Sequence, residues 1–246
     1  MKLLNVVRRK LFGEDWGPGS MRLPSAWRKA GGTGVRVLVI DTGAPESASV
    51  NRLASKNFVW DEGVNDLNGH ATSVCGIIRD WAPLAEIVCY KAIDRDGHLD
   101  GCMAVLAALR AAADIGGFHV VNISLAAYRG ASKLREPIRG IVADGGLVVA
   151  GAGNDPEKGL AFPARWPEVV AVGARDRHGA AAEFSPAGAD CLMPGVDIRA
   201  PWRSGYRVAS GTSLAAAAAS GLLALALSAG LDAPEARAWL ETHGRV

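Results

Sequence analysis

The sequence predicts an α/β protein in which a mostly parallel β-sheet carries helices on both of its faces. Short apolar, β-branched segments alternate along the chain with longer segments rich in alanine and leucine. This alternation is typical of parallel sheets, because a helix usually forms the crossover between two parallel strands. The strand segments are apolar almost throughout, which indicates that both faces of the sheet are buried.

The size of the chain fits one domain of this three-layer kind. It has 246 residues, of which 49% are hydrophobic and 21% are charged, and it is long enough to bury a substantial core. The sequence contains no internal repeat and no linker-like composition. We expect a single domain over residues 21–246, preceded by a tail over residues 1–20.

The individual elements follow in a regular order. The first strand is predicted at 35–40 (VRVLVI), because this β-branched run ends at an Asp-Thr-Gly turn signal. A long helix is predicted to start near Ser213, and a shorter one at Pro234, a residue that suits the first turn of a helix. Between these, we expect helices at 71–79, 101–114 and 132–144, and strands at 87–93, 119–125, 146–153 and 169–174.

The charge balance argues against a nucleic-acid-binding protein. The chain has 27 basic and 25 acidic side chains and a net charge of +2, and its lysines and arginines are scattered rather than clustered. The basic run at 8–10 is typical of a solvated terminus. The four cysteines form no metal-ligand spacing, so we interpret them as free thiols, three of them in apolar segments.

The sequence predicts no membrane segment. The apolar stretch at 3–7 is short and precedes its basic residues, whereas a secretory signal has a longer apolar region that follows them. We therefore expect a cytoplasmic protein. The apolar segment 214–229 is mostly alanine and includes Ser220, Gly221 and Ser228, so we predict a buried core helix there rather than a membrane span.

Four polar residues stand at predicted element boundaries. Asp41 closes the first strand, His70 stands at the start of a helix, Asn154 ends the fourth strand and Ser213 precedes the alanine run. Each of them alone has a structural explanation, as a turn or surface residue or, for the serine, as a helix N-cap. In parallel sheets, however, chemistry gathers just beyond the carboxyl ends of the strands, where these residues would meet.

Together the four residues meet the requirements of nucleophilic catalysis by a serine. A serine hydroxyl needs an imidazole to accept its proton, and the imidazole needs a carboxylate that holds it in the right tautomer. The oxyanion that forms on attack needs hydrogen-bond donors. The side-chain amide of Asn154 and the backbone N–H of Ser213, at a helix N-terminus, would supply them.

The segments around these residues resemble the motifs of the subtilisin-like serine proteases, the subtilase family. VLVIDTG resembles the family's Asp motif, HATSVCG its His motif, VVAGAGN its oxyanion motif and GTSLAAAAASG its Ser motif. The order Asp, His, Ser is that of subtilisin. VNISL, FPARWPEVVAVGA and MPGVDI also resemble family segments. The resemblance extends over about residues 16–240 and implies a single-domain, three-layer subtilisin-like fold.

The resemblance implies a role for each residue in a serine endopeptidase. Asp41 would orient His70, which would act as general base and then general acid; Ser213 would attack the scissile carbonyl, and Asn154 would stabilise the oxyanion. The substrate, a peptide or protein, would lie extended between two segments of the chain. The residues implied in substrate binding are Leu99, Asp100 and Gly101, Ser124, Leu125 and Ala126, and, at the base of the first specificity pocket, Ala152, Gly153 and Ala161. Because that base is small and uncharged, we expect an apolar residue before the cleaved bond.

The chain departs from the family pattern at two helices, and the departures leave alternatives open. The family usually has Gly and His at the positions of Ala71 and Ser73, and Pro and His at those of Ala217 and Ala218. More room beside Ser213 would admit an amine as well as water, so peptide ligation or cyclisation is an alternative to hydrolysis. A second alternative is a pseudoenzyme that binds extended peptides, although a binding protein would need none of the four polar residues.

The last expectations concern cofactors and partners. A long calcium-binding loop, which many family members carry after the His helix, is missing, because CGIIRDWAPLAEIVCYKAI leads directly from helix to strand. We therefore expect no metal at that place and no cofactor. No pro-region of the family's usual size precedes the domain, so we also consider a partner or a pro-segment supplied by another chain.

Overall fold

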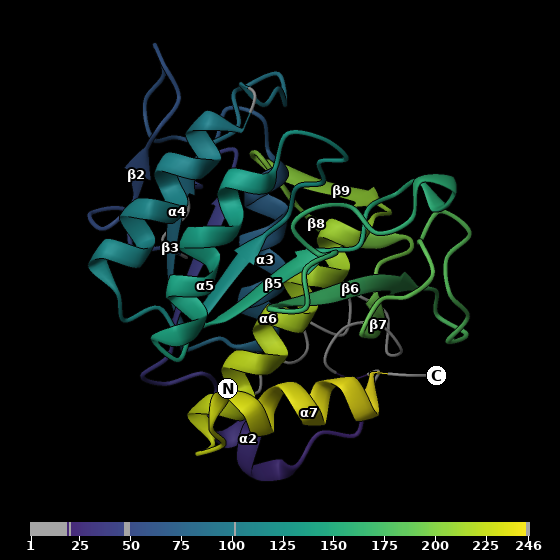
Figure 1. Cartoon of the computed structure of the whole chain (residues 1–246). Helices are drawn as coiled ribbons and strands as arrows, with labels where there is room; N and C mark the ends of the chain where they lie inside the picture. Colours follow the sequence, from purple (N-terminus) through teal and green to yellow (C-terminus); the bar gives the residue numbers. More distant parts are fainter. Residues whose placement is uncertain (1–18, 20, 47–49, 101, 245–246) are drawn as a thin grey trace.

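A parallel sheet forms the centre of the molecule. The computed structural model describes residues 19, 21–46, 50–100 and 102–244. Seven strands lie in the order β2-β3-β1-β4-β5-β6-β7, and every neighbouring pair is parallel (Figure 1). The strands are β1 (Arg36–Asp41), β2 (Lys56–Asn57), β3 (Glu86–Lys91), β4 (Val120–Ile123), β5 (Leu147–Gly151), β6 (Val169–Arg175) and β7 (Cys191–Pro194). The predicted fold class, a mostly parallel sheet, is confirmed.

Helices cover both faces of this sheet, as the sequence predicts. In Figure 1, α4 (Met103–Ile115) and α5 (Arg135–Ala143) lie in front of the sheet, and α3 (His70–Trp81) and α6 (Thr212–Ser228) lie behind it. Successive side chains of β1 pack against different helix layers, because side chains alternate between the two faces of a strand. Leu38 and Ile40 pack in the core beneath the front pair, whereas Val37 and Val39 pack in the core beneath the rear pair.

Helix α6 contains the alanine run and is almost wholly buried. Its residues from Leu214 to Ala226 are inaccessible to solvent, so the predicted core helix is confirmed. Small side chains let α6 approach α3 closely: a Cβ atom placed on Gly221 would lie 2.5 Å from the Cβ of Trp81. Alanine also has the highest helix propensity, so the run stays helical without bulky side chains. Among the described residues, none of the helices has both the length and the apolar character of a membrane span.

A β-hairpin holds the amino-terminal end of α3. It consists of β8 (Ile198–Trp202) and β9 (Gly205–Ala209), which pair antiparallel. The indole of Trp202 covers Gly69, where a Cβ would lie 2.8 Å from the ring atom Cε2. Gly69 also has a φ of 110°, a conformation that side-chain-bearing residues rarely adopt. The hydroxyl of Ser73 donates a hydrogen bond of 2.5 Å to the carbonyl of Pro201, which ties hairpin and helix together.

The remaining helices close the end of the molecule that lies lowest in Figure 1. They are α2 (Ser25–Ala30) and α7 (Ala233–His243), and the rings of Trp27 and Trp239 meet between them at a centroid distance of 4.6 Å. Helix α7 begins with a capping box, in which the side chain of Asp232 accepts from the backbone of Glu235 and the glutamate side chain accepts in return. Two short 3₁₀ helices complete the elements, η2 (Ser132–Leu134) and η3 (Pro156–Lys158).

Several predicted boundaries differ from the structure. The predicted strands 119–125 and 146–153 end earlier, at Ile123 and Gly151, because the residues that follow leave the sheet to form loops above its edge. The predicted helix 132–144 opens with a 3₁₀ turn before α5. The sequence analysis did not identify α2, β2, β7, β8 or β9, which are short elements without a long apolar run.

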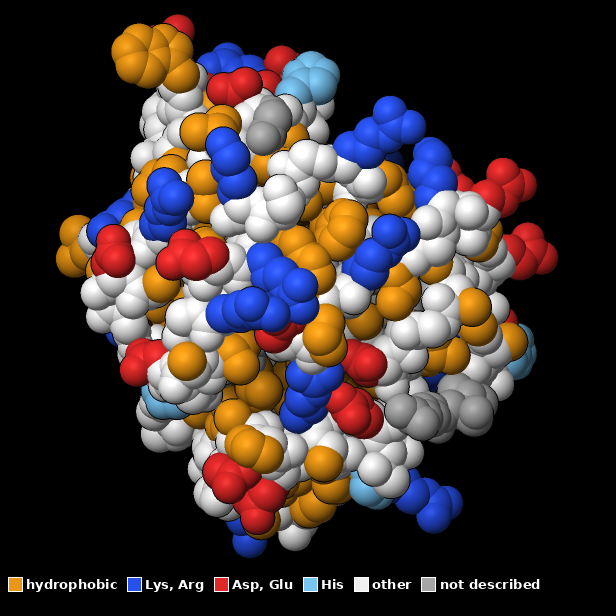
Figure 2. All heavy atoms as spheres, viewed as in Figure 1, with side chains coloured by type: hydrophobic (Ala, Val, Ile, Leu, Met, Phe, Trp, Pro, Cys, Tyr) orange, Lys and Arg blue, Asp and Glu red, His pale blue; other side chains and the backbone are white. Residues whose placement is uncertain are grey.

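Two further predictions concern thiols and surface charge. All four cysteines are free and buried, as predicted, and the sulfur atoms of Cys75 and Cys89 approach to 3.4 Å. Figure 2 shows basic and acidic side chains interspersed over one face of the molecule, in agreement with the scattered charges of the sequence. Most of the predicted tail, residues 1–20, lies outside the described residues.

Candidate active site

The fold brings the four predicted polar residues to one edge of the sheet. Asp41 is the last residue of β1, and Asn154 follows the end of β5 by three positions. His70 is the first residue of α3, and Ser213 is the second residue of α6. Because the strands are parallel, their carboxyl ends share this edge, where loops and helix amino-termini meet.

Asp41 and His70 form a buried pair. The carboxylate of Asp41 is fully buried and accepts from Nδ1 of His70, with distances of 2.8 Å to Oδ1 and 2.9 Å to Oδ2. The backbone N–H of Thr42 donates to the same Oδ1 at 2.7 Å. The imidazole itself is 29% exposed. The carboxylate thus fixes Nδ1 as the protonated nitrogen and leaves Nε2 for proton exchange.

The surroundings of His70 raise its pKa above the ordinary value. Burial lowers the pKa, because the charged imidazolium loses solvent. The charge of Asp41, its hydrogen bond and the charge of Asp66 act in the opposite direction and prevail. The ring is therefore stabilised in the protonated state that it would reach after accepting a proton from a serine.

Asp66 organises the start of α3 and was missed by the sequence analysis. Its Oδ1 accepts from the hydroxyl of Thr42 at 2.8 Å, and its Oδ2 from the hydroxyl of Thr72 at 2.6 Å. It also accepts from three backbone N–H groups, those of Asn68, Gly69 and Thr72. A carboxylate at this position accepts hydrogen bonds from backbone N–H groups at the start of α3 that have no partner within the helix. His70 lies in this first turn. The aspartate four residues before His70 was the signal in the sequence.

The side-chain amide of Asn154 and the backbone nitrogen of Ser213 both lie close to Gly211. The Oδ1 of Asn154 accepts from the backbone N–H of Thr212 at 3.0 Å and from its hydroxyl at 3.1 Å, which orients the amide. A Cβ placed on Gly211 would lie 3.6 Å from Nδ2 of Asn154 and 4.0 Å from the backbone nitrogen of Ser213. Two N–H donors therefore border the space that the missing side chain of Gly211 leaves open.

A chain of buried hydrogen bonds ends at the backbone carbonyl of Ser213. The hydroxyl of Ser124 donates to the carbonyl of Ser213 at 3.1 Å, and the amide of Asn122 donates to that hydroxyl at 2.8 Å. Ser220, two turns further along α6, donates to Oδ1 of Asn122 at 3.0 Å. Within the described part of the chain, no hydrogen bond joins the Ser213 hydroxyl to His70. Catalytic hydrogen bonds are often longer in structures without substrate than in the reacting complex.

The residues predicted at the base of the specificity pocket are neighbours. Ala152, Gly153 and Ala161 are all buried, and the backbone N–H of Ala161 donates to the carbonyl of Ala152 at 2.9 Å. The hydroxyl of Tyr128, a residue that the sequence analysis missed, comes within 2.7 Å of a Cβ placed on Gly153.

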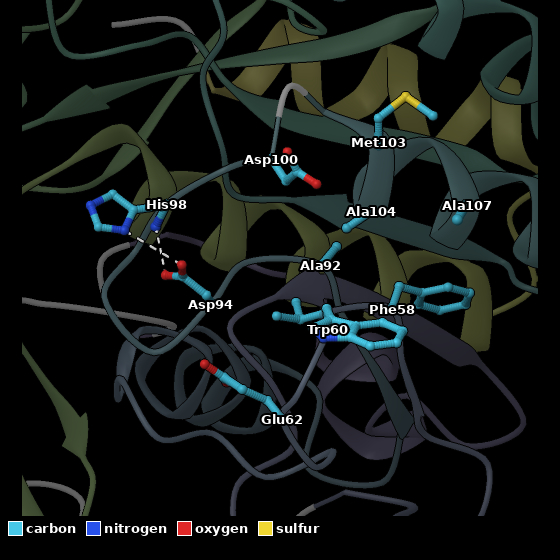
Figure 3. Close-up of a pocket in the computed structure, with 11 residues that line it drawn as sticks. Phe58, Trp60, Glu62, Ala92, Asp94, His98, Asp100, Met103, Ala104 and Ala107 are labelled. Carbon is cyan, nitrogen blue, oxygen red and sulfur yellow. Dashed lines mark hydrogen bonds and ion pairs between the residues drawn. The ribbon is translucent and has the colours of Figure 1, made fainter.

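The two predicted substrate-binding segments differ in what the structure describes. Ser124 and Leu125 are buried and Ala126 is exposed. Leu99 is half-buried and Asp100 is exposed, whereas Gly101 lies outside the described residues. Asp100 lines a cavity of about 440 Å³ (Figure 3). Its apolar lining comes from the segment that follows β2, from the residue that follows β3 and from α4. The apolar lining residues are Phe58, Val59, Trp60, Ala92, Met103, Ala104 and Ala107.

Asp94 and His98, which also line this cavity, cluster with Asp96. Ligand atoms of Asp94, Asp96 and His98 lie within 4.8 Å of one another, and Figure 3 shows the contacts between Asp94 and His98. Asp94 accepts from the backbone N–H groups of the other two, at 2.9 Å and 2.8 Å, so an ordinary turn explains the cluster.

Between α3 and β3, the four residues 82–85 form a direct connection, as the sequence predicts.

The departures Ala217 and Ala218 do not widen the site. Both side chains are buried in the core between α6 and the sheet. Helix α6 runs without a break from Thr212 to Ser228, since alanine retains the N–H that proline lacks.

Comparisons with known proteins identify the family and the fold of the chain. Residues 32–243 match the subtilase family. The chain is 33% identical over 224 residues to subtilisin BL of Lederbergia lenta, and the match covers 85% of this chain and 82% of that protein. It is also 33% identical to alkaline elastase YaB of Bacillus sp. (strain YaB), covering 85% of this chain and 59% of the elastase.

A solved structure shows the same fold. The crystal structure of a cold-adapted subtilisin-like serine proteinase superimposes with a TM-score of 0.76 at 28% sequence identity, covering 86% of this chain and 82% of the other. The overall fold is therefore shared with a protease of known structure. The chain belongs to the subtilase family and is a serine protease.

Proposed function

We propose that the protein is an endopeptidase that hydrolyses peptide bonds through Asp41, His70 and Ser213, with Asn154 in the oxyanion hole. The observation that carries this proposal is the buried pair of Asp41 and His70, at the edge of the sheet where α6 presents Ser213. The raised pKa of His70 supports the same role, because the ring gains a proton when the hydroxyl attacks.

The proposed reaction has two stages. The Ser213 hydroxyl gives its proton to Nε2 of His70 as it attacks the scissile carbonyl carbon, and the former carbonyl oxygen becomes an oxyanion. The two N–H donors beside Gly211 are placed to receive this oxyanion. His70 then protonates the leaving amine. Water releases the acyl group in the second stage, with His70 again accepting and returning a proton.

We favour water over an amine as the second nucleophile. The ligation alternative depended on extra room where the family proline is replaced. Ala217 and Ala218 are both buried in the core, so their small size does not enlarge the accessible site beside Ser213.

A digest of a mixed peptide library, read by mass spectrometry, tests the proposal. We expect new amino and carboxyl termini within the peptides, and no products from Ser213→Ala. His70→Ala should lower kcat by several orders of magnitude. Asn154→Ala should lower it about 100- to 1,000-fold. Full activity in Ser213→Ala, or ligated products alone, would contradict the proposal.

A further inference from the structure

Tyr128 reaches into the pocket that would hold the side chain before the cleaved bond. Its hydroxyl lies 2.7 Å from a Cβ placed on Gly153, and that same point lies 3.2 Å from the Cβ of Ala161. Both residues belong to the predicted base of the specificity pocket. The hydroxyl of Tyr128 therefore ends against two residues of the predicted base.

The backbone on which Tyr128 stands is firmly placed. Ala127 and Phe162 exchange two hydrogen bonds: the N–H of Ala127 donates to the carbonyl of Phe162 at 2.9 Å, and the reverse bond measures 2.8 Å. This antiparallel bridge holds the segment of Tyr128 against the segment that contributes Ala161.

The ring of Tyr128 is held as well. The ammonium group of Lys158 lies 5.2 Å from the ring centroid, a distance at which a cation is attracted to an aromatic face. Lys158 is in turn paired with Asp155 at 2.6 Å. A basic residue thus lies against the face of the tyrosine ring.

The hydroxyl of Tyr128 is buried and has no hydrogen-bond partner among the described residues. A buried hydroxyl normally finds a partner, because leaving it unpaired costs free energy. Ala152, Gly153 and Ala161 have no side-chain donor or acceptor, so a partner would have to be brought by a bound molecule. The substrate side chain is the group that enters the predicted pocket during the reaction.

We propose that Tyr128 makes the protease selective for a short, hydroxyl-bearing side chain, serine above all, immediately before the cleaved bond. This inference rests on the proposed function. The ring limits the length of the side chain, and the hydroxyl supplies a donor and an acceptor at the end of the shortened pocket. It replaces the expectation of a general apolar preference, which considered only the small residues at the base.

The two effects of Tyr128 should change kcat/KM by different factors. A long apolar side chain such as phenylalanine must displace a held ring, which should lower kcat/KM about 10- to 100-fold relative to alanine. A serine hydroxyl gains one hydrogen bond over alanine, which should raise kcat/KM about 3- to 10-fold.

The experiment uses three fluorogenic peptides that differ only before the cut, with serine, alanine or phenylalanine. Each is offered to the full chain, to Tyr128→Phe and to Tyr128→Gly. Tyr128→Phe removes the oxygen alone and should abolish the preference for serine over alanine while phenylalanine stays disfavoured. Tyr128→Gly should raise kcat/KM for phenylalanine at least about tenfold, because it opens the pocket.

Tyr206 offers matched controls, since it is exposed on the β8–β9 hairpin. Tyr206→Phe and Tyr206→Gly should leave all three values unchanged within about twofold. Thermal unfolding of every variant checks that the fold is intact. A protein that prefers phenylalanine over alanine, or a Tyr128→Gly variant with unchanged selectivity, would overturn the proposal.

A binding measurement separates this inference from the proposed function. The same three sequences, labelled for fluorescence anisotropy, are titrated into Ser213→Ala, with and without Tyr128→Phe. We expect the serine peptide to bind more tightly than the alanine peptide, and only when Tyr128 is present. If the wild-type chain cleaves nothing but this binding pattern holds, the proposed function fails and the assignment of Tyr128 stands. Equal binding of the two peptides would overturn the assignment.

Discussion

Opposing effects act on the imidazole of His70. Burial favours its neutral form, whereas the carboxylate of Asp41 favours the charged form and prevails, with Asp66 acting in the same direction. A general base must be neutral before it accepts a proton. Activity should therefore be absent when the ring is protonated and should rise as pH passes through its pKa.

The first prediction concerns the pH profile. Because the pKa of His70 is raised, kcat/KM should increase with pH around a midpoint above about 6.5. Asp41→Asn removes the main charge that raises the pKa, so the midpoint should move downward, and kcat should fall by roughly 10⁴ because the tautomer is no longer fixed. NMR titration of the ring in a Ser213→Ala background measures the shift directly. Asp114→Asn, which changes an exposed carboxylate on α4, is the control, and an equal shift in both would refute the assignment.

The second prediction concerns Gly211. Its φ of 162° is an extended conformation open to any residue, and an added Cβ would make only ordinary contacts. Gly211→Ala should therefore fold normally, yet its methyl group would lie within 4.0 Å of both Nδ2 of Asn154 and the backbone nitrogen of Ser213. We expect kcat to fall at least about 100-fold, as when an oxyanion-hole donor is lost.

A control for this substitution is available in the same chain. Gly63 has open space where a Cβ would be added, so Gly63→Ala should leave both activity and melting temperature unchanged. If Gly211→Ala kept full activity, the oxyanion would have to bind elsewhere.

Between elements, a buried polar chain links β4 to α6 next to Ser213. Ser220, Asn122 and Ser124 pass hydrogen bonds from the middle of α6 to the carbonyl of Ser213. Ser220 and Asn122 are fully buried, so the Ser220 hydroxyl and Oδ1 of Asn122 satisfy each other away from solvent.

The third prediction tests this chain. Ser220→Ala removes a donor from a buried carbonyl oxygen and should lower the free energy of unfolding by about 1–3 kcal/mol. Thr242→Ala removes a similar hydroxyl on α7, which donates to the carbonyl of Ala238 but is exposed, so it should cost within about 0.5 kcal/mol. Denaturant unfolding compares the two variants. Equal costs would show that the buried chain adds nothing.

Sequence patterns predicted the long elements better than the short ones. The apolar runs of β1, β3, β4, β5 and β6 and the alanine-rich α6 are evident because each is buried along most of its length. The hairpin β8–β9 escaped prediction, because β9 is largely exposed and β8 contains a proline. Its role depends on the contact of Trp202 with Gly69, which no local pattern shows.

The residues of the candidate site were likewise predicted only where a local sequence pattern marks them. Asp41, His70, Asn154 and Ser213 stand at element ends and resemble family motifs, so they were identified from the sequence. Residues that act through tertiary contacts were not. Tyr128 meets Gly153, and Ser220 meets Asn122, only after the chain has folded.

At the scale of the whole molecule, the proposed site combines three elements from two layers. The sheet supplies Asp41, and two helices behind it supply His70 and Ser213. These residues are far apart in sequence, and the close contact of α3 with α6 at Gly221 brings the two helices together. Reactivity of the serine is therefore a property of the assembled fold, and it should disappear on unfolding.

Labelling by a fluorophosphonate, followed by intact-mass and peptide mapping, tests the central claim most directly. Such probes react with a serine only when a neighbouring base activates it. We predict a single label on Ser213 of the folded protein, no label in Ser213→Ala, and labelling slowed by several orders of magnitude in His70→Ala. A folded wild-type protein that stays unlabelled, or equal labelling of Ser213→Ala, would contradict the account and indicate a protein that only binds peptides.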